Sequence, residues 1–265
     1  MRACHYGAAS AVIGYVCCYQ ASRLLAARVR GIQGHFTKLP LGDQAEWHTR
    51  VASTVHAVVQ VLGSYYPALL SSDHLSERVR HYDTRLFVPY GITGLGPEFF
   101  NGLIVGYLLV DLAVVVWHAD VFDGVRAAVV HHAMGAAGWC VFMGSGFIQW
   151  YGCFLQLTEL STMFVNTHWW LKKCDATDKR VYLVNGILLF LVFFLIRVAS
   201  LPFTWAAFLM QDGSDLAEEG GLALMLTCVA GLLGNTVLQC LWFSMMLAAV
   251  VERFGPRKGD DVKLE

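Results

Sequence analysis

Charged residues are scarce in this chain. Only 15% of its 265 residues are Asp, Glu, Lys or Arg, whereas 56% are hydrophobic. Because a typical soluble domain has about 25% charged residues, this composition excludes a soluble globular protein. The formal net charge of −1 does not indicate a partner, but the lack of a basic patch interleaved with aromatic residues excludes a nucleic-acid-binding protein. Membrane lipids are the partners that this composition favours.

Several familiar site motifs are missing as well. The eight cysteines form no Cys-x-x-Cys pair, and no asparagine begins a glycosylation sequon. No histidines occur at His-x-x-His or His-Glu-x-x-His spacing, so we predict no metal site. The sequence likewise indicates no resident cofactor and no particular oligomeric state.

Long apolar runs stand in place of these motifs. A membrane-spanning helix needs about 20 apolar residues, and the mean hydropathy of the chain is +0.51. We therefore predict an all-α, polytopic membrane helical bundle of about seven transmembrane helices, with spans 2–7 around an internal cavity. The predicted spans cover residues 4–22, 47–70, 98–117, 124–143, 147–171, 181–210 and 221–251.

Glycine and proline mark the predicted joints and close contacts of these spans. Gly144 and Gly146 separate spans four and five into a tight helical hairpin. Pro202 predicts a kink in span six. Gly102 and Gly106 lie about one turn apart in span three, so they allow a neighbouring helix to approach closely.

Basic residues predict the orientation of the chain. Most Lys and Arg lie in the first, third and fifth loops and the C-terminal tail, although Arg78, Arg80 and Arg85 in the second loop depart from this pattern. The positive-inside rule then places the N-terminus on the lumenal side and the C-terminus in the cytosol. We predict a first span with a basic cytosolic loop over 1–46, one membrane domain over 47–252 and a polar cytosolic tail over 253–265.

Polar residues inside the apolar runs form the candidate site. An ionisable side chain within a span costs roughly 3 to more than 10 kcal/mol, so it faces a partner or a cavity. At helical rise these residues fall into one slab of the bundle, which predicts a shared cavity that opens toward the cytosol. The predicted cavity residues are Arg50, His56, Asp111, Gln156, Thr162, Asn166, Arg197 and Gln239.

The candidate catalytic residues are His131, His132 and Glu159. A neutral imidazole can take a proton from an attacking amine or hydroxyl while Glu159 or Asp111 orients the ring. Neighbouring helical residues point about 100° apart, so we expect only one of the two histidines to meet a substrate. A structural hydrogen-bond network is the alternative.

For Arg197 we predict an ion pair with Glu159 or Asp111. The alternative is that Arg197 binds a phosphate of a lipid or of CoA.

The order of these motifs resembles the TLC-domain family, named for translocation-associated, longevity-assurance and ceroid-lipofuscinosis membrane proteins. Within that family the chain looks like the branch of TLC-domain-containing transmembrane proteins, with the domain over 47–252. The resemblance implies a lipid-accessible cavity, usually in the endoplasmic reticulum membrane. The segments that carry it are WHTRVASTVHA (47–57), GYLLVDL (106–112), VVHHAMG (129–135), TELSTMFVNTHWWL (158–171), FFLIRV (193–198) and LQCLWF (238–243).

The best-known members of this family are ceramide synthases, which transfer an acyl group from acyl-CoA to a sphingoid-base amine. Their paired histidines match His131 and His132 here. Their Asp-x-Ser-Asp run is replaced by Glu-Leu-Ser-Thr at 159–162, and Gln239 stands where related members carry Asn. The resemblance therefore leaves two functions open. One is lipid binding that influences membrane lipid composition or homeostasis; the other is an acyltransferase on a sphingoid base or lysolipid, with acyl-CoA as co-substrate.

Overall fold

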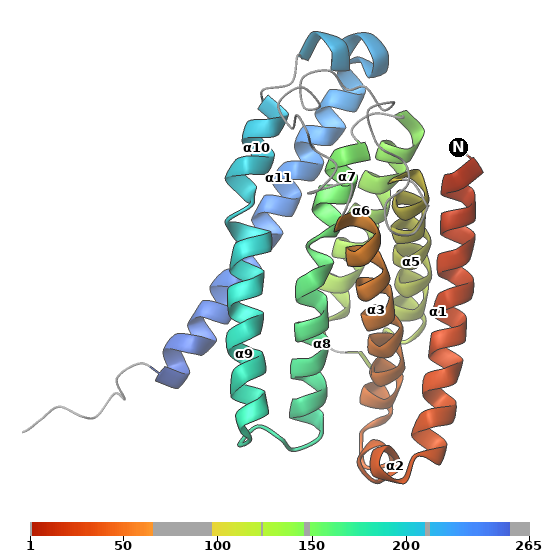
Figure 1. Cartoon of the computed structure of the whole chain (residues 1–265), viewed down its shortest axis with the longest axis vertical. Coiled ribbons are helices and arrows are strands. Elements are labelled where there is room, and N and C mark those ends of the chain that lie inside the picture. The colour runs from red at the N-terminus through yellow and green to blue at the C-terminus, as the bar shows by residue number, and fades with distance from the viewer. Residues whose placement is uncertain (1, 66–96, 123, 146–148, 210–212, 255–265) are drawn as a thin grey trace, which may run out of the picture.

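The structure, a computed structural model, describes residues 2–65, 97–122, 124–145, 149–209 and 213–254. Over these residues the chain forms helices and no strand, which confirms the all-α prediction. The longer helices run side by side along the molecule, and α11 crosses them obliquely (Figure 1). The elements are α1 (Arg2–Arg28), α2 (Arg30–Phe36), α3 (Leu41–Tyr65), α5 (Pro97–Trp117), α6 (Val125–Ser145), α7 (Gln149–Gln156), α8 (Glu159–Lys173), α9 (Arg180–Phe193), the π-helical turn η3 (Phe194–Val198), α10 (Leu201–Leu209) and α11 (Gly213–Phe254).

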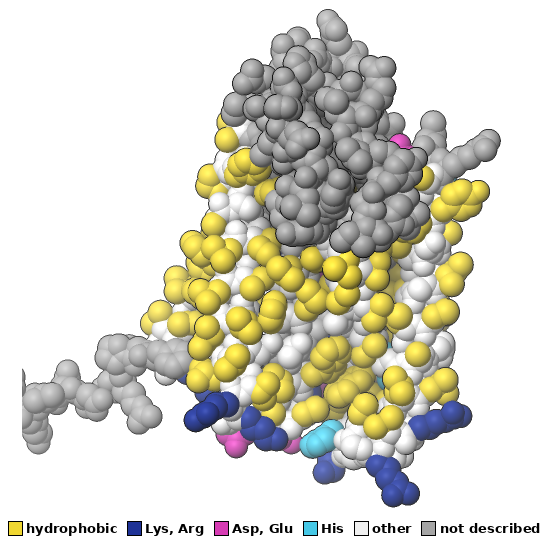
Figure 2. Space-filling view, viewed as in Figure 1, with side chains coloured by type: hydrophobic (Ala, Val, Ile, Leu, Met, Phe, Trp, Pro, Cys, Tyr) yellow, Lys and Arg dark blue, Asp and Glu magenta, His cyan; other side chains and the backbone are white. Residues whose placement is uncertain are grey.

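The outer surface is that of an integral membrane protein. Within the described residues, three helical stretches are long and apolar enough to cross a membrane: Glu98–Trp117, Arg180–Ala206 and Gly221–Arg253. Apolar side chains cover the middle of the face shown in Figure 2, whereas Lys and Arg gather at one end of it. The membrane class is confirmed, and the count of seven spans stays a prediction.

Span five is not one continuous helix, contrary to the prediction for 147–171. α7 ends at Gln156 and α8 begins at Glu159. At the junction, the Leu157 and Thr158 amides donate to carbonyls three residues back, at N···O distances of 3.2 and 3.1 Å. The Thr158 hydroxyl also donates to the Leu155 carbonyl at 2.6 Å. Threonine side chains that bond to the backbone in this way compete with the α-helical pattern, so the helix tightens and breaks here.

Span six is interrupted just before Pro202, as predicted. α9 passes into the π-helical turn η3, the chain turns at Ala199 and Ser200, and α10 begins at Leu201. Proline has no amide hydrogen, and its ring displaces the carbonyl four residues back. A π turn holds one extra residue compared with an α turn, so it changes the direction in which Arg197 points.

The last helix also contains a break at the predicted start of span seven. Gly221 has φ 70° and ψ 175° inside α11, so two helical pieces meet there. Residues with a side chain rarely adopt this conformation, whereas glycine adopts it freely. The piece from Gly221 onward is the one that is long and apolar enough to span a membrane.

α1 and α5 pack with their backbones in close approach. A Cβ atom added at Gly102 would lie 2.0 Å from the Cys4 carbonyl oxygen, and one at Gly106 would lie 2.3 Å from that of Ala8. The predicted role of these two glycines is therefore confirmed, and their neighbour is the first helix. Small residues at such a contact let two membrane helices gain van der Waals attraction over their whole length.

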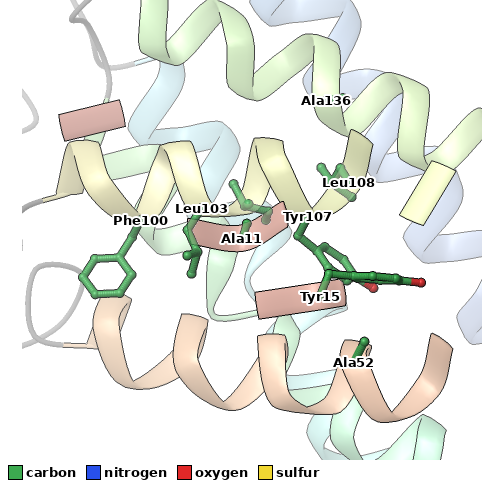
Figure 3. Packing of buried hydrophobic residues seen from close by; sticks show 9 residues of the cluster. Ala11, Tyr15, Ala52, Phe100, Leu103, Tyr107, Leu108 and Ala136 are labelled. Atoms are coloured by element: carbon green, nitrogen blue, oxygen red, sulfur yellow. The ribbon is translucent and has the colours of Figure 1, made fainter. Parts of the chain in front are cut away.

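The apolar core lies where α1, α3, α5 and α6 meet. Ala11 and Tyr15 from α1 pack against Leu103 and Tyr107 of α5 (Figure 3). Ala52 of α3 closes one side of this cluster, and residues of α6 close another. The first span, predicted to lie outside the main domain, is thus an integral wall of the core.

Several predictions fall outside the described residues. They concern the end of span two beyond Tyr65, the second loop with its three arginines, and the junction after Gly146. The last residue of span six, at position 210, and the polar tail from residue 255 also lie outside them.

The α1–α5 contact yields a stability prediction. Gly106→Ala places a methyl group within 2.3 Å of a backbone oxygen, so the two helices have to separate. We expect a loss of about 1–3 kcal/mol, measured as a lower midpoint of thermal unfolding in detergent. Gly14→Ala in α1 is the control, because its added Cβ meets nothing within 4 Å. Equal unfolding midpoints for the two variants would contradict this packing.

Candidate functional site

A pocket of about 130 Å³ lies among α5, α6, α7, α8, η3, α10 and α11. Its wall is mostly apolar, with side chains such as Leu108, Met134 and Trp139. An engineered cavity of about 150 Å³ admits benzene, so this pocket has room for a chemical group of similar size. The charged and strongly polar side chains that line it are His131, Glu159, Arg197, Asn235 and Gln239.

Arg197 reaches this pocket from η3 and is only 7% exposed. Its Nε donates to the Ser161 hydroxyl at 2.7 Å, and its Nη1 donates to the Gln239 side-chain oxygen at 3.3 Å. Its Nη2 donates to the Thr158 carbonyl at 3.0 Å and to the Thr162 hydroxyl at 3.4 Å. One guanidinium therefore ties together the break before α8, α8 itself and α11.

The predicted ion pair of Arg197 is wrong. Within the described residues, no carboxylate lies within the 4 Å that defines an ion pair with Arg197, although Glu159 is near enough to influence it electrostatically. Asp111 is engaged elsewhere, with Tyr15 and His132. The physical reason is geometric, because the α7–α8 break exposes neutral oxygens that satisfy most of the guanidinium donors.

The two neighbouring histidines face different surroundings. His131 lines the pocket, and its ring meets the Trp242 ring edge-on at a centroid distance of 5.1 Å. The Nε2 atom of His132 lies 3.4 Å from Asp111 Oδ2 instead. This is the arrangement expected for adjacent helical residues, in which only one histidine meets the pocket.

Asp111 is the centre of a buried contact between three helices. Its Oδ1 accepts a hydrogen bond of 2.7 Å from the Tyr15 hydroxyl of α1, and its Oδ2 faces His132 of α6. Asp111 as a whole is 6% exposed. Tyr15 was not among the predicted site residues, although a tyrosine in an apolar run usually needs a partner for its hydroxyl when it is buried.

Arg50 and Asn166 hold α3 against α8. Arg50 donates to Glu46 from Nε at 2.9 Å and from Nη2 at 2.5 Å, and to the Asn166 side-chain oxygen from Nη1 at 2.8 Å. Asn166 Nδ2 donates in turn to the Thr54 hydroxyl at 2.9 Å. The Arg50 guanidinium also lies 4.8 Å from the ring centroid of Trp169. These groups stabilise a helix contact and do not line the pocket.

Gln156 and His56 occupy two further buried contacts. Ser64 of α3 donates to the Gln156 side-chain oxygen, and Gln156 Nε2 donates to Asn101 Oδ1 of α5 at 2.6 Å. The His56 ring stacks on the Tyr107 ring with centroids 3.8 Å apart. Both predicted site residues therefore lie between helices rather than at the pocket.

The predicted site residues thus divide between the pocket and the helix contacts. His131, Glu159, Arg197 and Gln239 line the pocket, and Thr162 bonds to Arg197 beside it. Within the described chain, α3 contributes no residue to the pocket, so the six-span cavity of the sequence analysis is not confirmed. The pocket residues that sequence reasoning missed include Asn235, which accepts a hydrogen bond of 2.9 Å from Gln239 Nε2.

The contact between α1 and α5 can be tested by a double-mutant cycle. Tyr15→Phe removes the donor of a buried hydrogen bond and Asp111→Val removes its acceptor, so each should cost about 1–3 kcal/mol. We expect the double variant to lose less than the sum, with a coupling of about 0.5–3 kcal/mol, measured by thermal unfolding in detergent. Tyr19→Phe is the control, because the Tyr19 hydroxyl forms no hydrogen bond with another described residue. Additive losses would rule out this contact.

Comparison with known proteins identifies a family that matches most of the chain. A family model described as the TLC domain matches residues 46–248. TLC domain-containing protein 4 of Homo sapiens is 25% identical over 211 residues, 78% of this chain and 74% of the relative. TLC domain-containing protein 4-B of Danio rerio is 28% identical over 208 residues, with the same coverage of 78% and 74%.

The match to a third relative covers more of the chain. An uncharacterized TLC domain-containing protein of Schizosaccharomyces pombe is 25% identical over 240 residues, which is 89% of this chain and 76% of the relative. No solved structure matches the chain. With its helical membrane architecture and a domain match over most of its length, the chain belongs to the TLC-domain family.

Proposed function

We propose that this protein binds a membrane lipid in the pocket between α6, α8, η3 and α11 and thereby influences membrane lipid composition. The observation that carries the proposal is the composition of that pocket. Its wall is mostly apolar, and its few strongly polar groups include one cation, Arg197, and one carboxylate, Glu159. Ligand pockets for amphiphilic molecules combine an apolar lining with a small number of placed polar groups in this way.

The proposed location is the endoplasmic reticulum membrane, with the N-terminus lumenal and the C-terminus cytosolic. Arg28 ends α1, Lys172 and Lys173 end α8, and Arg180 begins α9. The ends of these helices lie away from the N-terminus, at the end of the bundle where basic side chains gather (Figures 1 and 2). The positive-inside rule assigns this end to the cytosol. We also propose that the chain crosses the membrane seven times.

Acyl transfer is the alternative, and the position of the carboxylates argues against it. A general base is strengthened and oriented by a carboxylate partner. Here the histidine that contacts Asp111 is His132, whereas the histidine at the pocket is His131. Within the described residues, His131 forms no ion pair with a carboxylate. Binding is therefore the function that this geometry supports better.

The test of lipid binding is to fill the pocket. Gly138 and Gly231 line it, and a Cβ added at either position meets nothing within 4 Å. We expect Gly138→Leu and Gly231→Leu to leave folding intact and to reduce lipid retained in nanodiscs roughly tenfold, which corresponds to about 1.4 kcal/mol. Native mass spectrometry of the purified protein measures this. Gly14→Leu in α1 is the matched control, because it adds the same group away from the pocket.

The same preparations decide between the two functions. Acyl-CoA is supplied with sphingoid bases and lysolipids, and release of free CoA is followed. CoA release that disappears in His131→Ala would replace the binding role with acyl transfer, since general base catalysis is worth about 10²–10⁴-fold. Unchanged lipid retention in both leucine variants would reject the pocket as the binding site.

A further inference from the structure

We infer that the pocket selects a zwitterionic lipid headgroup, with its anionic oxygen at Arg197 and its ammonium group at Glu159. This inference rests on the proposed lipid-binding function and names the chemistry of the ligand. It is carried by a pair of opposite charges that line one pocket without touching each other.

Arg197 supplies the positive end of the site. A guanidinium has five N–H donors, and four of them are used in the bonds to Ser161, Gln239, Thr158 and Thr162. All four acceptors are neutral oxygens, so no described residue neutralises the charge by an ion pair. The remaining N–H belongs to Nη1, whose bond to Gln239 is also a long one at 3.3 Å. An anionic ligand oxygen completes this side of the guanidinium.

Glu159 supplies the negative end. It lines the same pocket as Arg197, and its carboxylate forms no hydrogen bond or ion pair with another described residue. It is the first residue of α8, where the partial positive charge of a helix N-terminus favours a carboxylate. Glu159 and Arg197 line one pocket, yet their charged groups remain beyond 4 Å of each other. A ligand group can therefore stand between them.

A zwitterion satisfies both charges at once. A purely anionic headgroup at Arg197 is repelled by Glu159, and a purely cationic one is repelled by Arg197. Such repulsions are strong in an apolar pocket, because the low dielectric constant weakens screening. A pocket of about 130 Å³ holds a headgroup but not a long acyl chain, so the chain has to extend beyond it. The amine and phosphate of a phosphoethanolamine headgroup have the required charges.

The experiment compares ligands that share one oleoyl or oleyl chain. Wild-type protein in detergent is equilibrated with equal amounts of 1-oleoyl-lysophosphatidylethanolamine, 1-oleoyl-lysophosphatidic acid and oleylamine, and bound ligands are counted by native mass spectrometry. We expect the zwitterionic lysolipid to exceed each of the other two by about tenfold, because each charge contributes a charge-assisted hydrogen bond. Binding of all three in equal amounts would overturn the inference.

Charge-removing variants should shift this preference in opposite directions. Glu159→Gln should favour lysophosphatidic acid, and Arg197→Gln should favour oleylamine, each by about tenfold. Arg197→Lys and Glu159→Asp keep the charges and should keep the wild-type order. An order that stays the same in both charge-removing variants would overturn the inference while leaving lipid binding itself intact.

If Arg197→Gln does not fold, a third variant tests the role of Arg197 in its place. Gln239→Glu keeps the side-chain shape and gives Arg197 an internal carboxylate, since Gln239 already accepts a bond from it. We expect both phosphate-bearing lysolipids to weaken relative to oleylamine. An unchanged ratio would overturn the role of Arg197.

Free phosphoethanolamine separates the headgroup from the lipid. We expect it to compete poorly with the lysolipid, because it lacks the apolar chain. Equal competition would mean that a soluble zwitterion is the ligand, which would reject the proposed lipid function and keep the charge assignment. If Gly138→Leu loses lysolipid binding but the charge variants leave the headgroup preference unchanged, the proposed lipid function would stand and the charge assignment would be rejected.

Discussion

The hydrogen bonding of the buried Arg197 guanidinium is the constraint around which the pocket is built. An arginine inside a membrane bundle is stable only if its donors find acceptors in the protein. Here the acceptors come from three places: the Thr158 carbonyl at the α7–α8 break, the Ser161 and Thr162 hydroxyls of α8, and Gln239 of α11. The π turn η3 directs the side chain toward them. Two local departures from α-helix therefore serve one side chain.

The same reasoning explains why the first helix belongs to the bundle. Asp111 lies inside α5 and has to be satisfied there, and its two partners come from α1 and α6. The glycines of α5 bring the α1 backbone close enough for the Tyr15 hydroxyl to reach the carboxylate. The TLC-domain match begins at residue 46, yet the core and this hydrogen bond both require α1. The structural unit is thus larger than the family domain.

Sequence patterns predicted the helices better than their contacts. Apolar runs and Pro202 indicate where helices lie and where span six breaks, because both effects are local. The partner of a buried polar group depends instead on how each helix is rotated about its axis, and hydropathy does not determine that rotation for helices that are apolar on all sides. Asp111 was correctly associated with a histidine, but the Tyr15 hydroxyl was missed. The Thr158 carbonyl that replaces the predicted carboxylate partner of Arg197 is a backbone group without any sequence signature.

The position of the pocket follows from where the backbone is irregular. Non-helical backbone at membrane depth is stable only when it is buried in protein or lines a cavity. The break at Thr158 and the turn η3 both border the pocket, and the Thr158 carbonyl finds its partner there in Arg197. Charged side chains at the helix contacts also differ from those at the pocket. Arg50 and Lys173, at helix contacts, form ion pairs with Glu46 and Asp43, whereas Arg197 and Glu159 at the pocket do not pair with each other. The Arg50–Glu46 pair lies within α3 and the Lys173–Asp43 pair joins α8 to α3, whereas the two charges that remain apart are those that we propose to meet a ligand.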